Sequence, residues 1–148
     1  MIFSNYNQLA TSKIRKDILG LASCGIESVL PKNFMSQALK LSNNNLVFDG
    51  ENYSIAGKRI FVLGVGKASV SMGREVEKIL GVKNITAGLV ISNIYNGNLQ
   101  KIEVHRGSHP VPDSHSVSGS DKILKFKDRF NLNENDLIIF LISGGGSS

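Results

Sequence analysis

The sequence contains a single cysteine, no tryptophan, and no apolar run of the roughly 18 residues needed to cross a bilayer. One cysteine excludes an intrachain disulfide and cannot build a zinc site by itself, so Cys24 is expected to act as a small buried hydrophobe. The N-terminal segment MIFSNYNQLA lacks the charged and apolar regions of a secretory signal peptide. These absences predict a cytoplasmic protein without membrane contact.

The charge balance is moderately basic. Charged residues make up 20% of the 148 residues and hydrophobic residues 41%, which is typical of a soluble domain with an apolar core. The 17 Lys and Arg exceed the 12 Asp and Glu, and the resulting charge of +5 favours anionic ligands. Because no basic stretch carries the interleaved aromatic residues that stack bases, nucleic-acid binding is not expected.

Residues 1–46 are predicted to form a helical segment that packs on a sheet. Apolar residues recur there at helical spacing, namely at Ile14, Ile18, Leu21 and Val29, with Gly25 in the same register. Pro31 suits the first turn of a second helix. The connector that follows contains Asp49-Gly50, a pair that favours a tight hairpin turn.

Residues 47–148 predict an α/β domain. The segments 59–66, 85–92 and 136–143 are continuous apolar runs, typical of parallel strands covered by helices on both faces. Segment 101–106 alternates, as an edge strand does, and helices are expected over 67–80 and 113–130. The order predicts an open, mostly parallel sheet of Rossmann type, incomplete at its C-terminal end because no helix follows the last strand.

The first glycine motif, GVGKAS, joins a strand to a helix. It resembles a dinucleotide fingerprint, but Ser69 replaces the third glycine and no acidic residue ends the next strand, so a nicotinamide cofactor is disfavoured. Gly64, Gly66 and Ser69 are candidates to bind substrate or phosphate, and the alternative is that the glycines only allow a tight turn. Lys67 is unusual, because a helix N-terminus disfavours a cation unless an anion lies beside it. A solvent-pointing lysine is the equally weighted alternative.

The second motif, GSHPVPDSHS, is a loop stiffened by two prolines. His105, His109 and His115 do not predict a metal site, because Gly107 and Pro110 prevent a shared helical face. His109 and Asp113 are candidates either to bind a ligand or to hold the loop. For Asp113, helix capping is the favoured single role.

The third motif is the glycine loop Ser143–Ser148, which follows an apolar strand. It contains Gly144, Gly145, Gly146 and Ser147. Successive amides without Cβ atoms form a nest for an anion, although the spacing is not that of a Walker A loop. A flexible tail is the alternative. All three loops follow strands, and ligands of open α/β sheets bind beyond the carboxyl ends of strands.

Together, the segments FVLGVGKASVSMG, AGLVIS, GSHPVPDSHSV and LISGGGSS resemble the N-terminal part of the class II glycerate 2-kinases, which are also called hydroxypyruvate reductases. The resemblance implies transfer of the ATP γ-phosphoryl group to the 2-hydroxyl of D-glycerate with Mg²⁺. It assigns Lys67 to the transferring phosphoryl group, and the loop Ser143–Ser148 to phosphate or the glycerate carboxylate. It places His109 and Asp113 in the cleft wall.

The sequence differs from the family in its length. Members of this family are roughly three times longer and carry a second, C-terminal domain called MOFRL, as expected of a two-domain protein. We therefore expect little or no kinase activity from this chain alone, and an association with the C-terminal part if the gene is split. An NAD(P)-dependent hydroxypyruvate reductase and a non-catalytic sugar-phosphate-binding module stay open as alternatives.

Overall fold

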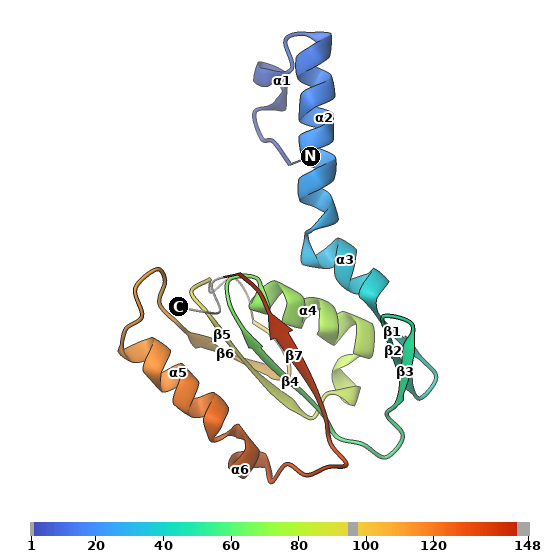
Figure 1. The fold of residues 1–148 in the computed structure, drawn as a ribbon, viewed down its shortest axis with the longest axis vertical. Helices are drawn as coiled ribbons and strands as arrows, with labels where there is room; N and C mark the ends of the chain where they lie inside the picture. The colour runs from blue at the N-terminus through green and yellow to red at the C-terminus, as the bar shows by residue number, and fades with distance from the viewer. Residues whose placement is uncertain (1, 95–97, 145–148) are drawn as a thin grey trace.

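The computed structural model describes residues 2–94 and 98–144 and consists of two sheets with helices around the larger one (Figure 1). The helices are α1 (Tyr6–Leu9), α2 (Lys13–Ser28), α3 (Pro31–Ala38), α4 (Ser69–Leu80), α5 (Ser114–Leu124) and α6 (Phe126–Phe130), with a 3-10 turn at Val82–Asn84. The strands are β1 (Leu39–Ser42), β2 (Asn45–Phe48), β3 (Glu51–Ser54), β4 (Ile60–Val65), β5 (Ala87–Ser92), β6 (Ile102–Arg106) and β7 (Leu137–Ile142).

The larger sheet is parallel throughout, in the order β6-β5-β4-β7. Its central strand β4 is an apolar run, and its side chains are buried from Ile60 to Leu63 because helices lie on both faces. The carboxyl ends of all four strands therefore lie at one edge of the sheet. The predicted open, parallel α/β class is confirmed, as is the edge position of the alternating strand β6.

The two faces of the sheet have separate cores. On one face, α4 packs through Val70, Val76 and Leu80. On the other, α6 places Phe126 against Phe61 of β4 with ring centroids 5.9 Å apart, in the edge-to-face arrangement that aromatic pairs favour. Figure 1 shows α4 and the α5–α6 pair on opposite sides of the sheet. The single helix expected over 113–130 is divided in two at Lys125.

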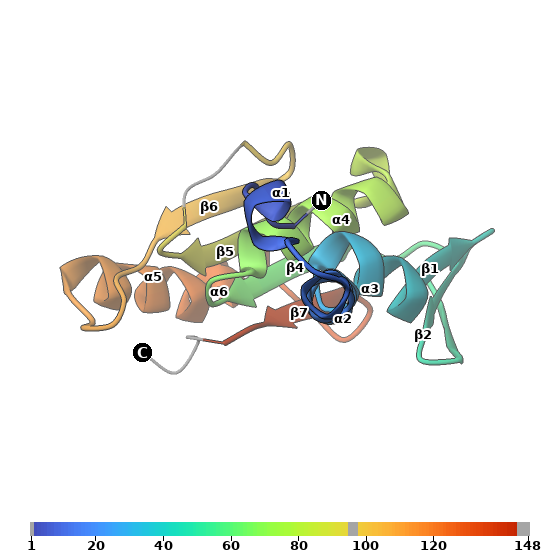
Figure 2. The same ribbon diagram turned by 90° about the horizontal axis from the view of Figure 1, so that it is seen from above.

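Helix α2 extends away from the sheets along the long axis of the molecule, and Figure 2 views it end-on. Ser12 caps it by accepting a hydrogen bond from the Arg15 amide at 3.3 Å. None of its residues is buried, and Leu21 in the predicted apolar stripe is 76% exposed. Cys24 is also exposed, so the prediction that it is buried is wrong, because α2 lies outside the packed body. Among the described residues, no helix is long and apolar enough to cross a membrane.

Residues 39–54 form a three-stranded antiparallel sheet, β1-β2-β3, in place of the end of the expected helical segment 1–46. The helical part of that segment ends at Ala38. The turn at Asp49 and Gly50 joins β2 to β3, as predicted, and both residues have positive φ, 50° and 83°. Met35 of α3 and Leu46 of β2 are buried and join the small sheet to the core on the α4 face.

Strand β7 lies at the open edge of the parallel sheet, and its burial differs from the prediction. Its residues alternate between covered and exposed positions: Leu141 is buried, whereas Ile138, Phe140 and Ile142 are exposed by 45%, 47% and 68%. In the register with β4, Phe140 pairs with Leu63, so both face the α5–α6 side of the sheet. The core on that side centres on Phe61 and Phe126 and leaves the outer face of β7 uncovered.

Candidate functional site

The loops after β4, β5 and β6 border one small cavity of about 90 Å³ at the carboxyl edge of the sheet. The lining comes from all three loops and from the first turns of α5. Its residues are Val65, Gly66, Lys67, Ile91, Asn93, Gly107, Ser108, His109, Ser116 and Ser120. Of the three glycine- or proline-containing motifs in the sequence, the first two meet here. The lining residues are polar or glycine apart from Val65 and Ile91 at the strand ends.

Lys67 supplies the cation of this cavity. It lies in the turn between β4 and α4 with an exposed side chain. Within the described part of the chain, no carboxylate lies within salt-bridge distance of its ammonium group. Its main-chain position is fixed, because its amide donates to the Gly144 carbonyl oxygen at 3.2 Å. A lysine held in place by its backbone and free of a carboxylate is suited to an anionic ligand.

Gly66 is required by the geometry of this turn. Its φ is +104°, a conformation that side-chain-bearing residues rarely adopt. A Cβ atom at this position would lie 2.5 Å from both the carbonyl oxygen and the Oγ of Ser143. The glycine therefore allows the loop after β7 to pack directly against the turn that carries Lys67.

Gly64 and Ser69, two further predicted phosphate-binding residues, make close contacts within the fold and are absent from the cavity lining. Gly64 lies inside β4, where a Cβ would come within 3.0 Å of Val90 on β5 and 3.1 Å of Leu141 on β7. Ser69 is fully buried and donates its hydroxyl to the Gly66 carbonyl oxygen at 2.8 Å and to that of Ile91 at 3.2 Å. These two residues hold the strands and the turn together and do not line the cavity.

Ser143 and Gly144, which were predicted to bind the anion, lie against the turn that precedes helix α4. The Ala68 amide donates to Ser143 Oγ at 2.9 Å, and the Ser143 amide donates to the Val65 carbonyl oxygen at 3.1 Å. The amides of Lys67 and Ala68, in the turn just before α4, thus have partners in the loop after β7. The remaining predicted residues of this loop, Gly145, Gly146, Ser147 and Ser148, lie outside the described residues.

His109 and Asp113 belong to the loop between β6 and α5. His109 lines the cavity, whereas Asp113 does not. The Asp113 carboxylate accepts hydrogen bonds from the amides of His115 at 2.8 Å and Ser116 at 3.3 Å, which confirms the predicted N-cap. A hydrogen bond from the Ser108 side chain, followed by those from the two amides, holds the pKa of Asp113 below its usual range. Asp113 therefore orients the loop that carries His109.

Sequence reasoning did not single out four polar residues of the cavity: Asn93, Ser108, Ser116 and Ser120. Asn93 follows β5, and its position after an apolar strand was a usable signal. Ser116 and Ser120 are four residues apart on α5, and this spacing places them on one helical face. Ser116 Oγ accepts the Ser108 amide at 3.1 Å, so it also ties the loop to the helix.

The arrangement is one of a cation surrounded by hydroxyl, amide and imidazole groups at the carboxyl edge of a parallel sheet. Among residues 2–94 and 98–144 there is no cluster of three or more His, Cys, Asp or Glu side chains that could hold a metal ion. The fold and the site together define an α/β protein with a small cavity, lined by one lysine and several polar groups, at the carboxyl ends of its strands.

The family model for DUF4147, described as a domain of unknown function, matches residues 17–148, and the chain belongs to this family. It is 34% identical over 136 residues to a glycerate 2-kinase of Pyrococcus horikoshii, which covers 91% of this chain and 30% of the relative. It is 37% identical over 90 residues to a putative hydroxypyruvate reductase of Agrobacterium vitis, covering 61% of this chain and 20% of that protein. The predicted resemblance to glycerate 2-kinases is thereby confirmed.

A solved structure agrees with the sequence comparison. The crystal structure of the PH0495 protein of Pyrococcus horikoshii superimposes with a TM-score of 0.78 at 33% identity, over 93% of this chain and 30% of that one. The chain thus spans about 30% of the length of the glycerate 2-kinases that it matches. The structure accordingly corresponds to the N-terminal part of a larger kinase architecture.

Proposed function

We propose that this chain provides the phosphoryl-binding half of a glycerate 2-kinase, which transfers the γ-phosphoryl group of ATP to the 2-hydroxyl of D-glycerate. The observation that carries the proposal is Lys67. Its ammonium has no carboxylate partner in the described structure, and it lines the polar cavity at the carboxyl edge of the sheet. The glycerate 2-kinase relatives support the choice of phosphoryl group and acceptor.

The residues of the cavity fit the needs of phosphoryl transfer. Charge on the transferred group is spread over its oxygens, so catalysis requires positioning and a nearby cation more than covalent chemistry. Lys67 supplies the cation, and the hydroxyls of Ser116 and Ser120, with Asn93, supply hydrogen-bonding groups around it. The magnesium ion that accompanies ATP neutralises phosphate charge and is bound largely through phosphate oxygens and water, so it requires few protein ligands.

We further propose that the chain alone phosphorylates glycerate slowly or not at all. The cavity of about 90 Å³ is smaller than the 300–1,000 Å³ or so that encloses a ligand of nucleotide size. The remaining walls are then supplied by polypeptide corresponding to the other 70% or so of the relatives. Binding of ATP and turnover of glycerate are therefore separate tests.

Ligand-dependent stabilisation of the purified chain tests the proposal. ATP with Mg²⁺ should raise the melting temperature in proportion to the logarithm of ligand over its dissociation constant, and NADH should not. Lys67→Ala should remove most of this response, because the phosphate loses its cation. Lys58→Ala, which removes a lysine just before β4 and outside the cavity, is the matched control and should keep it.

Two outcomes would contradict the proposal. An ATP response that survives Lys67→Ala would remove the lysine from the site. Stabilisation by NADH alone would instead favour a nicotinamide-dependent reductase, the activity in the name of the Agrobacterium relative.

A further inference from the structure

We infer that the open edge of β7, with the apolar groove beside it, is a docking surface for a second polypeptide. The partner is the part of a glycerate 2-kinase that this chain does not span. The inference rests on the proposed function, since it takes the partner from the same enzyme class. The docking surface consists of the residues of β7 together with the groove residues on α3, β2, β3 and α4.

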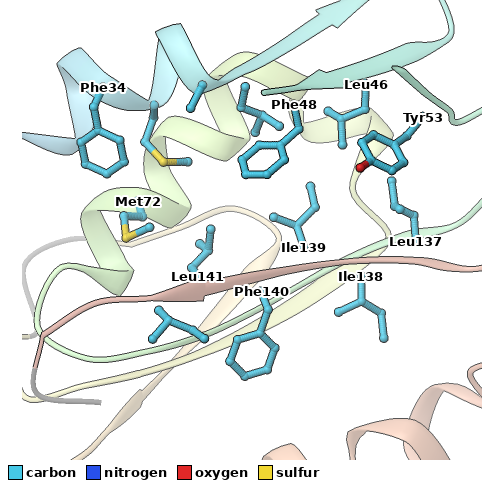
Figure 3. A pocket seen from close by; sticks show the side chains of 14 residues that line it. Phe34, Leu46, Phe48, Tyr53, Met72, Leu137, Ile138, Ile139, Phe140 and Leu141 are labelled. Atoms are coloured by element: carbon cyan, nitrogen blue, oxygen red, sulfur yellow. The ribbon is translucent and has the colours of Figure 1, made fainter. Parts of the chain in front are cut away.

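The groove lies between β7 and the small sheet and has a volume of about 570 Å³. Its walls are apolar and come from four directions: Phe34 on α3, Phe48 on β2, Tyr53 on β3 and Met72 on α4. Figure 3 shows Ile139 and Leu141 on the side of these residues, with Ile138 and Phe140 on the opposite side of β7. The strand thus presents apolar side chains on both of its faces.

The backbone of β7 is open on the side away from β4. The amides of Leu137 and Ser143 donate to β4 or its flanks, so the alternating residues Ile138, Phe140 and Ile142 direct their amides outward. No strand pairs with these amides among the described residues. Six consecutive apolar residues without a charge or proline form an edge that folded proteins normally cover.

The exposed apolar area is too large for a strand that ends a sheet. Phe140 and Ile142 are exposed by 47% and 68%, although the strand is as apolar as the central strand β4. A parallel strand that is apolar on both faces is typical of the interior of an α/β sheet, where helices cover both sides. The surface therefore fits a strand that pairs with β7 and an apolar helix that fills the groove.

The choice of partner follows from the comparisons. The solved structure from Pyrococcus horikoshii contains this fold as 30% of its chain, so about 70% of that architecture has no counterpart here. A polypeptide carrying that remainder supplies both a strand and covering helices. A second copy of this chain offers the same strand, the same groove and the exposed apolar residues of α2, so a dimer is the competing occupant that the experiment below distinguishes.

Co-expression tests the surface. The probe is the C-terminal portion of the Pyrococcus horikoshii glycerate 2-kinase. Its boundary is chosen so that it forms a soluble complex with the segment of the same protein that this chain matches, and that complex is the reference for association. This chain should form a one-to-one complex with the probe. Hydrogen exchange at the amides of Ile138, Phe140 and Ile142 should then slow about tenfold or more, because they become paired.

Two variants separate the docking surface from the fold. Ile138→Pro removes an outward amide that β4 does not use, and Phe140→Lys places a charge on the exposed face; each should weaken the complex about 100-fold or more. Leu124→Lys is the matched control, since Leu124 is 76% exposed on α5 and lies outside the groove. All three variants should keep the circular dichroism of the parent chain.

The possible results of these experiments lead to different conclusions. The inference is overturned if the reference pair associates but this chain does not, or if the complex forms while the β7 amides still exchange rapidly. Protection of these amides in the chain alone, accompanied by a dimer mass, would assign the surface to a second copy and also overturn it. A complex that docks through β7 yet transfers no phosphoryl group to glycerate would refute the proposed function and leave the docking surface standing.

Discussion

Replacement of Gly66 by alanine is the most direct test of how the lysine turn is held. The residue has a φ of +104°, and its new Cβ would lie 2.5 Å from two oxygens of Ser143, one of them in the backbone. The conformational strain is on the order of 1–2 kcal/mol for an L-residue. Movement of Ser143 breaks the hydrogen bond from the Ala68 amide, which adds about 0.5–1.5 kcal/mol. We expect a total loss of about 2–3 kcal/mol in the free energy of unfolding.

Urea unfolding followed by circular dichroism measures this loss, and Gly57→Ala is its control. Gly57 also has a positive φ, +70°, but no atom lies within 4 Å of the position that a Cβ would take there. This second variant therefore carries the backbone strain without the collision. If Gly66→Ala destabilises the chain no more than Gly57→Ala does, the argument that Ser143 packs against the lysine turn is refuted.

Two further predictions concern Glu77, a buried carboxylate, and Asp136, a carboxylate paired with Arg59. Glu77→Ala should lower the free energy of unfolding by about 2–4 kcal/mol in urea melts, because it leaves the amides of Gln100 and Lys101 without their acceptor. Glu75→Ala on the same helix breaks one ion pair with the exposed Lys78 and leaves no backbone amide without its acceptor, so it should cost about 1 kcal/mol or less. For Asp136, the hydrogen bond from Arg59 lowers the folded-state pKa, so its stabilisation is full above the ordinary pKa of about 4 and is lost as the pH falls through the lowered value. The stability difference between wild type and Asp136→Asn should be constant from about pH 5 to 7 and narrow below about pH 4, and a difference that widens there would contradict the assignment.

Much of the fold follows from patterns in the sequence. The runs around Phe61 and Leu89 are almost entirely apolar, which is typical of strands between helix layers. The run around Ile139 is equally apolar and also forms a parallel strand, but one of its faces is uncovered. The Asp49-Gly50 turn and the Asp113 cap were also predictable, because each depends on local backbone chemistry.

The parts that could not be predicted depend on contacts between distant segments. Nothing near Ser69 in the sequence indicates that its hydroxyl bonds to the Ile91 carbonyl oxygen, 22 residues away. In the same way, the hydrogen bond from the Ala68 amide to Ser143 Oγ joins residues 75 positions apart. The exposure of Cys24 depends on where α2 lies relative to the sheets, and a helical period does not specify that position.

The contact between Ser143 and the turn before α4 also connects the two proposals. Ser143 follows β7 directly, and its backbone and side chain hold the turn that carries Lys67. The position of Lys67 therefore depends on β7 remaining paired with β4, and β7 is the strand whose outer edge and outer face are uncovered. A polypeptide that covers β7 would restrain Ser143 and, through it, the lysine turn. Because coupling between two sites is reciprocal, an anion that orders the lysine turn must also favour docking at β7 by the same factor.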